Sequence, residues 1–199
     1  IVDIDEAVSS ISQALERAER MTGVPITRAH VAASGNHISC MDSKGVIAVS
    51  RADGEIAEHD IVRVIDASQA ISIPANREVL HVIPKSFTLD GQGGIKDPLG
   101  MTGIRLEVDT LIIHGGIPFL KNVHKAISQA GLEVDQLVVA PLASAQAVLS
   151  KRQKELGVAV VDMGAGTTSM VVYEENNVLH TTVIQIGSMH ITNDIAIGL

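Results

Sequence analysis

The sequence of 199 residues contains one cysteine, no tryptophan and only three aromatic residues, Phe87, Phe119 and Tyr173. The single thiol, Cys40, excludes an internal disulfide, so the reducing cytoplasm is the expected compartment. The scarcity of aromatic rings argues against a platform on which nucleotide bases stack. Acidic residues outnumber basic ones by 23 to 15, and the chain is therefore not expected to bind nucleic acid.

The sequence also lacks a long apolar run. Its apolar stretches, such as residues 137–143, fall far short of the ~18 residues that cross a bilayer. A hydrophobic content of 46% nevertheless excludes a disordered chain, and the length suits one large domain or two small ones. Neither an initiator methionine nor a signal peptide precedes the acidic opening, and the sequence ends within an expected helix. We interpret both ends as cuts in a longer protein.

Alternating helical and extended patterns predict an α/β fold. A polar turn at residues 42–45 is expected to join two short strands, and Asn176 and Asn177 are expected to form a hairpin turn. Residues 90–103 are interpreted as a turn-rich connection, and residues 151–155 as a charged link. Helices are expected at 4–18, 58–71, 118–131, 142–150 and from 190 or 192 onward. Strands are expected at 26–33, 38–41, 46–49, 77–89, 104–113, 136–140, 158–161, 169–173 and 178–186.

The most informative segment, Asp162–Thr168 (DMGAGTT), lies between two of these strands. Its small central residues let backbone N–H groups approach a phosphate, and its two threonines add hydroxyl donors. Asp162, at the end of a buried strand, can hold Mg²⁺ through water. A Walker loop would need a lysine, and a Rossmann turn would need a third glycine where Ser169 stands. The pattern therefore predicts a strand–turn–strand phosphate site, with an ordinary glycine hairpin as the alternative.

Other chemistries find less support in the sequence. The eight histidines show no His-Glu-x-x-His motif and no i, i+4 pair, so we interpret them as surface or packed residues. Cys40 is interpreted as a packed side chain, because the sequence places no base beside it. Residues 3–6 are expected to cap a helix. The charged run 51–60 is either a solvated helix entry or part of an interaction surface.

Longer segments resemble the FtsA family of bacterial cell-division proteins. The segment at 162–168 is similar to the second phosphate motif of the actin-like ATPase superfamily, which actin, DnaK-type chaperones and sugar kinases share. The resemblance runs in the same order along the whole chain. It is carried by residues 34–39 (SGNHIS), 80–84 (LHVIP), 94–101 (GIKDPLGM) and 190–196 (HITNDIA).

This resemblance implies an actin-like, ribonuclease-H-like lobe with an inserted α+β subdomain and the start of a second lobe. Subdomain 1A would comprise residues 1–33 and 113–156, subdomain 1C residues 34–112, and the start of subdomain 2A residues 157–199. ATP and Mg²⁺ are the implied cofactors, with Asp162 holding the metal through water. The implied nucleotide-binding positions are Asp162, Gly164, Ala165, Gly166, Thr167 and Thr168.

Two positions depart from the family pattern. The family often has glycine at 165 and aspartate at 169, where this sequence has Ala165 and Ser169. Alanine adds a methyl group near the phosphates and disfavours a positive φ, and serine removes a carboxylate that could position metal or water. We therefore expect ATP binding with weak or no hydrolysis.

Members of the FtsA family are filament-forming adaptors that link FtsZ to the membrane. The resemblance implies self-association and contact with later division proteins through residues 34–112, at the cytoplasmic face of the inner membrane. FtsZ and the membrane would be contacted by parts absent from this sequence, as are the first phosphate hairpin and the adenosine motif. Because an actin-type site closes from two lobes, we expect the chain alone to bind ATP weakly and to be inactive.

Two alternatives remain open at this point. A protein-interaction module similar to the pilus-assembly protein PilM would share the arrangement of residues 34–112 and would need no hydrolysis. A small-molecule kinase of the same superfamily would share the phosphate turn, and it would need a catalytic carboxylate in the first lobe. Asp97, in the 90–103 connection, is the nearest candidate for that carboxylate.

Overall fold

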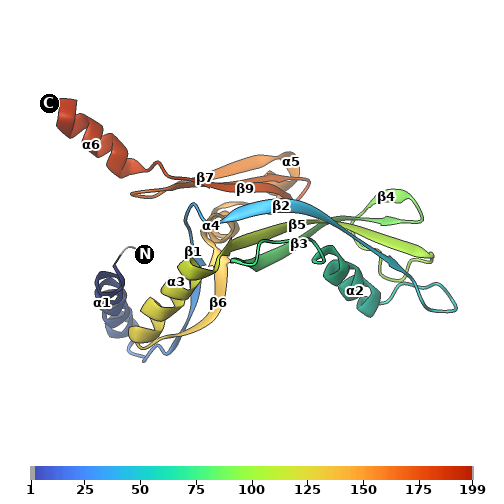
Figure 1. The fold of residues 1–199 in the computed structure, drawn as a ribbon, viewed down its shortest axis with the longest axis horizontal. Coiled ribbons are helices and arrows are strands. Elements are labelled where there is room, and N and C mark those ends of the chain that lie inside the picture. Colours follow the sequence, from blue (N-terminus) through green and yellow to red (C-terminus); the bar gives the residue numbers. More distant parts are fainter. Residues whose placement is uncertain (1–2, 199) are drawn as a thin grey trace.

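A computed structural model describes residues 3–198, and it confirms the α/β class (Figure 1). Residues 1, 2 and 199, which belong to the predicted subdomains at the two ends, lie outside the described residues. The helices are α1 (Ile4–Thr22), α2 (Glu58–Ser68), α3 (Ile117–Gln129), α4 (Ala140–Val148), α5 (Lys151–Leu156) and α6 (Ser188–Gly198). The strands are β1 (Arg28–Ala33), β2 (Ser39–Ala48), β3 (Arg77–Leu89), β4 (Gln92–Ile95), β5 (Arg105–Gly116), β6 (Glu133–Val139), β7 (Val158–Met163), β8 (Thr168–Glu174) and β9 (Asn177–Ile184).

Strands β1 and β6 form a parallel pair, which is accompanied by helices α1 and α3 (Figure 1). Helix α1 begins where predicted, because the Asp3 carboxylate accepts a hydrogen bond from the N–H of Glu6 (3.0 Å). It ends at Gly23, whose φ of 70° is the left-handed conformation that suits a helix end. The apolar stripe of α1 packs against α3, as the helical spacing of the sequence requires.

The second sheet has the order β2-β5-β3-β4, and α2 covers one of its faces. Strand β2 is continuous through residues 42–45, so the prediction of a polar turn there was wrong. Its small residues serve the contact with α2 instead. A Cβ on Gly45 would lie 2.0 Å from the carbonyl oxygen of Val64, and the Ser43 hydroxyl donates to the carbonyl oxygen of Ser68 (2.6 Å). The glycine is needed because the helix approaches the strand closely.

Several other boundaries differ from the predictions, and strand β4 (Gln92–Ile95) lies within residues 90–103, which were expected to be a turn-rich connection. Helix α2 ends at Ser68 instead of residue 71, and the expected link at 151–155 is helix α5. The Ser150 hydroxyl and the Gln153 side chain cap that helix reciprocally, a capping box that the charged composition concealed. The hairpin turn lies one residue earlier than expected, at Glu175 and Asn176, which have φ values of 51° and 68°.

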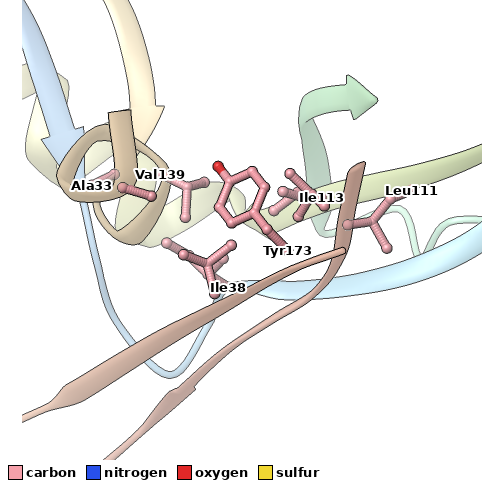
Figure 2. Packing of buried hydrophobic residues seen from close by; sticks show 9 residues of the cluster. Ala33, Ile38, Leu111, Ile113, Val139 and Tyr173 are labelled. Atoms are coloured by element: carbon pink, nitrogen blue, oxygen red, sulfur yellow. The ribbon is translucent and has the colours of Figure 1, made fainter. Parts of the chain in front are cut away.

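The main hydrophobic core lies where the three sheets of the described residues meet. Figure 2 shows the Tyr173 ring among side chains from β1, β5 and β6 and the loop after β1. The buried members are Ala33, Ile38, Leu111, Ile113, Val139, Ala145, Val171, Tyr173 and Val178. A second cluster fills the space between α2 and its sheet. Because the first cluster draws on all three sheets, it fixes strand β8 against the rest of the molecule.

Strands β7, β8 and β9 form an antiparallel sheet, and α6 projects away from it (Figure 1). The apolar side chains of α6 are exposed: Met189, Ile191, Ile195 and Ile197. None of the helices within residues 3–198 is both long and apolar enough to cross a membrane.

Candidate functional site

The segment at 162–168 has the predicted strand–turn–strand geometry. Strands β7 and β8 pair so that Asp162 lies opposite Ser169, and the N–H of Gly164 closes the turn on the carbonyl oxygen of Thr167 (2.9 Å). No residue of the turn has a positive φ. The concern that Ala165 would strain the turn was therefore wrong, because its backbone conformation is one that alanine adopts freely.

Helix α6 holds the turn from one side. The N–H groups of Ser188 and Met189 donate to the carbonyl oxygens of Gly164 and Ala165, both at 2.9 Å. Gly187 makes this approach possible, since a Cβ there would lie 2.4 Å from the carbonyl oxygen of Ala165. The N–H groups of Ser188 and Met189 at the start of α6 are thus satisfied by the turn, and the carbonyl groups of Gly164 and Ala165 are occupied.

Three N–H groups on this turn are, in contrast, free. Those of Ala165, Gly166 and Thr167 make no hydrogen bond to any residue of the 3–198 range. Unused N–H groups on three successive small or short residues are donors of the kind that bind an anion. The N–H donors that phosphate binding requires are therefore available on this turn.

The two threonines of the motif have different surroundings. The Thr168 hydroxyl is buried and donates to the carbonyl oxygen of Ile186 (2.6 Å), so its hydrogen is engaged within the protein. Thr167 is half-buried and lines a cavity of about 680 Å³ with residues 31–37 and Phe119. Of the two predicted hydroxyl donors, Thr167 is the one that faces open space.

Asp162 is half-buried at the end of β7. Its Oδ2 accepts a hydrogen bond from the hydroxyl of Ser144 on α4 (3.0 Å). Its Oδ1 has no hydrogen-bond partner among the described side chains and backbone groups. One carboxylate oxygen is therefore held by the protein, and the other can accept a hydrogen bond from metal-bound water.

The residues described here include no group of three or more histidine, cysteine, aspartate or glutamate side chains that could coordinate a metal directly. A divalent ion beside Asp162 would consequently be held by water and by ligand oxygens. Mg²⁺ suits such a site, because it keeps much of its hydration shell and binds one or two carboxylates together with phosphates.

Two hydroxyl groups that lie at the site were not predicted from the sequence. Ser144 reaches Asp162 from α4, and Ser34 pairs with Ser169 at 2.9 Å between the two hydroxyl oxygens. Ser34 belongs to the 34–39 segment that carries the resemblance, but no pattern in the sequence pairs it with Ser169, and Ser144 belongs to none of the motifs singled out. Ser169 itself is buried, so the position where the family often has aspartate is occupied here by a neutral hydroxyl pair.

The surroundings of Cys40 also include a residue that was not predicted from the sequence. His180 on β9 places its Nδ1 3.4 Å from the Cys40 Sγ, so a base does lie beside the thiol. The Sγ also contacts the carbonyl oxygen of Thr181 (3.2 Å), to which it donates. The half-buried thiol thus joins β2 to β9 as a packed side chain.

Asp97 lies after β4, and its carboxylate accepts a hydrogen bond from the N–H of Leu99 (3.0 Å). This carboxylate, the candidate for a kinase reaction, therefore stabilises its own loop.

Known proteins match this chain along its whole length. The family model described as "SHS2 domain inserted in FTSA" matches residues 35–114, and the model "Cell division protein FtsA" matches residues 159–199. The cell division protein FtsA of Bacillus subtilis (strain 168) is 44% identical over 199 residues, which cover all of this chain and 45% of that protein. FtsA of Pseudomonas aeruginosa is 41% identical over the same 199 residues, which cover 47% of that protein. The chain spans about half the length of the curated relatives it matches.

Among solved structures, a PilM–PilN type IV pilus biogenesis complex matches with a TM-score of 0.51 and 18% sequence identity. That match covers 81% of this chain and 44% of the other. The ethanolamine utilization protein EutJ from Carboxydothermus hydrogenoformans covers 98% of this chain and 42% of its own, with 18% identity and a TM-score of 0.49. The chain therefore shares the actin-like fold, with an inserted SHS2 domain.

Proposed function

Since the chain belongs to the FtsA family of cell-division proteins, we propose that it is part of an ATP-binding, filament-forming adaptor of the bacterial division ring. In this proposal the complete protein links FtsZ to the membrane and recruits later division proteins. It acts in the cytoplasm, at the inner face of the inner membrane. FtsZ and the membrane are contacted by parts of the protein outside residues 1–199.

The proposed division into subdomains follows the three sheets, except that strand β5 crosses the boundary between residues 112 and 113. Subdomain 1A comprises residues 1–33 and 113–156, 1C comprises 34–112, and 2A begins at 157. The match of residues 35–114 to the model of an inserted domain supports this boundary. In the proposal, 1C carries the contacts with a second copy and with later division proteins, and the charged run 51–60 belongs to that surface.

The observation that carries nucleotide binding is the set of three free N–H groups on a turn that α6 holds through the carbonyl groups of Gly164 and Ala165. In the proposal, these donors bind the β- and γ-phosphates of ATP, assisted by the hydroxyl of Thr167. Mg²⁺ lies beside Asp162 with water between them. The neutral hydroxyl of Ser169 offers no second carboxylate, and we therefore expect hydrolysis to be weak or absent.

Calorimetric titration of Mg-ATP into the complete protein tests this proposal. We expect micromolar binding, which corresponds to about 8 kcal/mol, and at least a tenfold loss for Asp162→Ala. The matched control is Asp97→Ala, which removes a carboxylate that only caps its own loop and should leave ATP binding unchanged. Absence of ATP binding by the complete protein would contradict the proposal. A loss of phosphoryl transfer in Asp97→Ala would favour the kinase alternative.

A protein-interaction module similar to PilM is the second candidate, and the shared fold over 81% of the chain favours it. The two candidates differ in self-association. Electron microscopy of the complete protein with ATP should show filaments if it is an adaptor of the proposed kind. Dispersed particles that still bind a partner peptide would support the interaction module.

A further inference from the structure

We propose that Ser144 is a positioning residue for Asp162, and that it selects the carboxylate oxygen which receives the Mg²⁺ hydration shell. This inference rests on the proposed binding of Mg-ATP at the 162–168 turn. It adds a residue from helix α4, outside the phosphate motif, to the metal side of that site.

The position of α4 makes Ser144 a fixed donor. Helix α4 follows β6 directly and packs against β7 and β8. Pro141 and Ala145 of this helix are buried, and Ala145 has no exposed surface. These packed residues hold the backbone at Ser144 in place, so that rotation about χ1 decides which acceptor its hydroxyl reaches.

The Ser144 hydroxyl has two candidate acceptors, a backbone carbonyl oxygen of its own helix and the Asp162 carboxylate. A serine inside a helix commonly donates to the carbonyl oxygen four residues earlier, which here would be that of Ala140. In this structure the hydroxyl donates to Oδ2 of Asp162 at 3.0 Å. A hydrogen bond to an ionised acceptor is stronger than one to a neutral carbonyl, so the carboxylate is the favoured partner.

This bond has a direct consequence for the carboxylate. The terminal torsion of an aspartate side chain is broad and nearly two-fold, so an unrestrained carboxylate presents either oxygen in several directions. Ser144 occupies Oδ2 and thereby leaves Oδ1 as the acceptor for metal-bound water. Partners that orient a metal ligand in this way commonly change metal affinity by about tenfold or more when they are removed.

The test measures how ATP binding by the complete protein depends on Mg²⁺. Wild type, Ser144→Ala and Ser144→Thr are titrated with ATP at graded Mg²⁺ concentrations and in EDTA, and their thermal unfolding is recorded. Ser10→Ala is the matched control, since Ser10 is an exposed serine of helix α1. We expect Ser144→Ala to raise the half-saturating Mg²⁺ concentration about three- to tenfold. ATP affinity in EDTA should change less than about twofold, and Ser144→Thr, which keeps the hydroxyl, should resemble wild type.

Each other outcome is decisive. If wild type binds Mg-ATP and Ser144→Ala keeps the same Mg²⁺ dependence, the positioning role is refuted and the proposed function stands. If the variant loses affinity equally with Mg²⁺ and in EDTA, with a lower melting temperature, Ser144 has only a structural role. If wild type does not bind Mg-ATP at all, the proposed function fails, and this inference fails with it.

Discussion

The hydroxyl oxygens of Ser34 and Ser169 lie 2.9 Å apart, although 135 residues separate them in the sequence. Ser34 follows β1, and Ser169 is the second residue of β8, next to the candidate phosphate turn. Ser169 is 3% exposed, and the hydroxyl of the exposed Ser34 is its hydrogen-bond partner. This pair ties the turn to the point where the chain leaves the first sheet for the second.

Ser34→Ala should therefore destabilise the protein. The substitution leaves the Ser169 hydroxyl buried without its partner, and we expect the free energy of unfolding to fall by about 1–2 kcal/mol. Urea denaturation measures the change. The double variant Ser34→Ala/Ser169→Ala should recover part of the loss, because both polar groups are then removed. Additive losses in the double variant would contradict a direct interaction.

Gly45→Ala should destabilise the fold far more than the addition of a single methyl group usually does. A Cβ at this position would lie 2.0 Å from the carbonyl oxygen of Val64, so α2 must move away from the sheet. We expect a loss of at least about 3 kcal/mol in the free energy of unfolding, or failure to fold. Gly93→Ala is the matched control, since its Cβ would meet only the Thr88 hydroxyl, at an ordinary 3.4 Å. Similar losses for both variants in urea denaturation would refute the explanation from close packing.

Acid should weaken the fold through three histidines, of which His114 is buried and His37 and His81 are half-buried. Burial lowers the pKa of His81, whose Nε2 accepts the N–H of Val139 (3.1 Å), so the folded state favours the neutral ring. Burial also lowers the pKa values of His37 and His114, and the charge of Arg77 adds to this effect. Since each pKa is lower in the folded state than in the unfolded state, the unfolded chain binds more protons below about pH 6.5. Stability should be complete above that pH and should decline as the pH falls below it.

Urea denaturation between pH 5 and 7.5 checks this expectation. His81→Gln should show a weaker decline below pH 6.5 than wild type, because one of the titrating groups is removed. His124→Gln, on the exposed side of α3, serves as the control and should retain the decline of the wild type. A urea midpoint that stays constant across this range would contradict the predicted linkage.

The success of the sequence predictions depended on how local the relevant interactions are. Helix α1 was predicted from its apolar spacing, its acidic first turn and its terminal glycine, all of which act within a few residues. The 162–168 turn was predicted from small residues between two apolar strands for the same reason. The errors at Gly45 and at residues 151–155 arose where a small or charged residue type fits either a turn or a regular element.

Residue patterns alone were enough to predict the α/β class, the positions of most helices and strands, and a strand–turn–strand motif with Asp162 at its entrance. The surroundings of that motif depend on the tertiary structure. Folding brings Ser144 and Ser34 to the turn, engages the Thr168 hydroxyl, and lets α6 bind the carbonyl groups of Gly164 and Ala165 while three N–H groups stay free. These contacts join residues that are distant in the sequence, and the packing of the three sheets around Tyr173 holds them in place. No periodicity or local motif encodes them, because they depend on which surfaces meet when the chain folds.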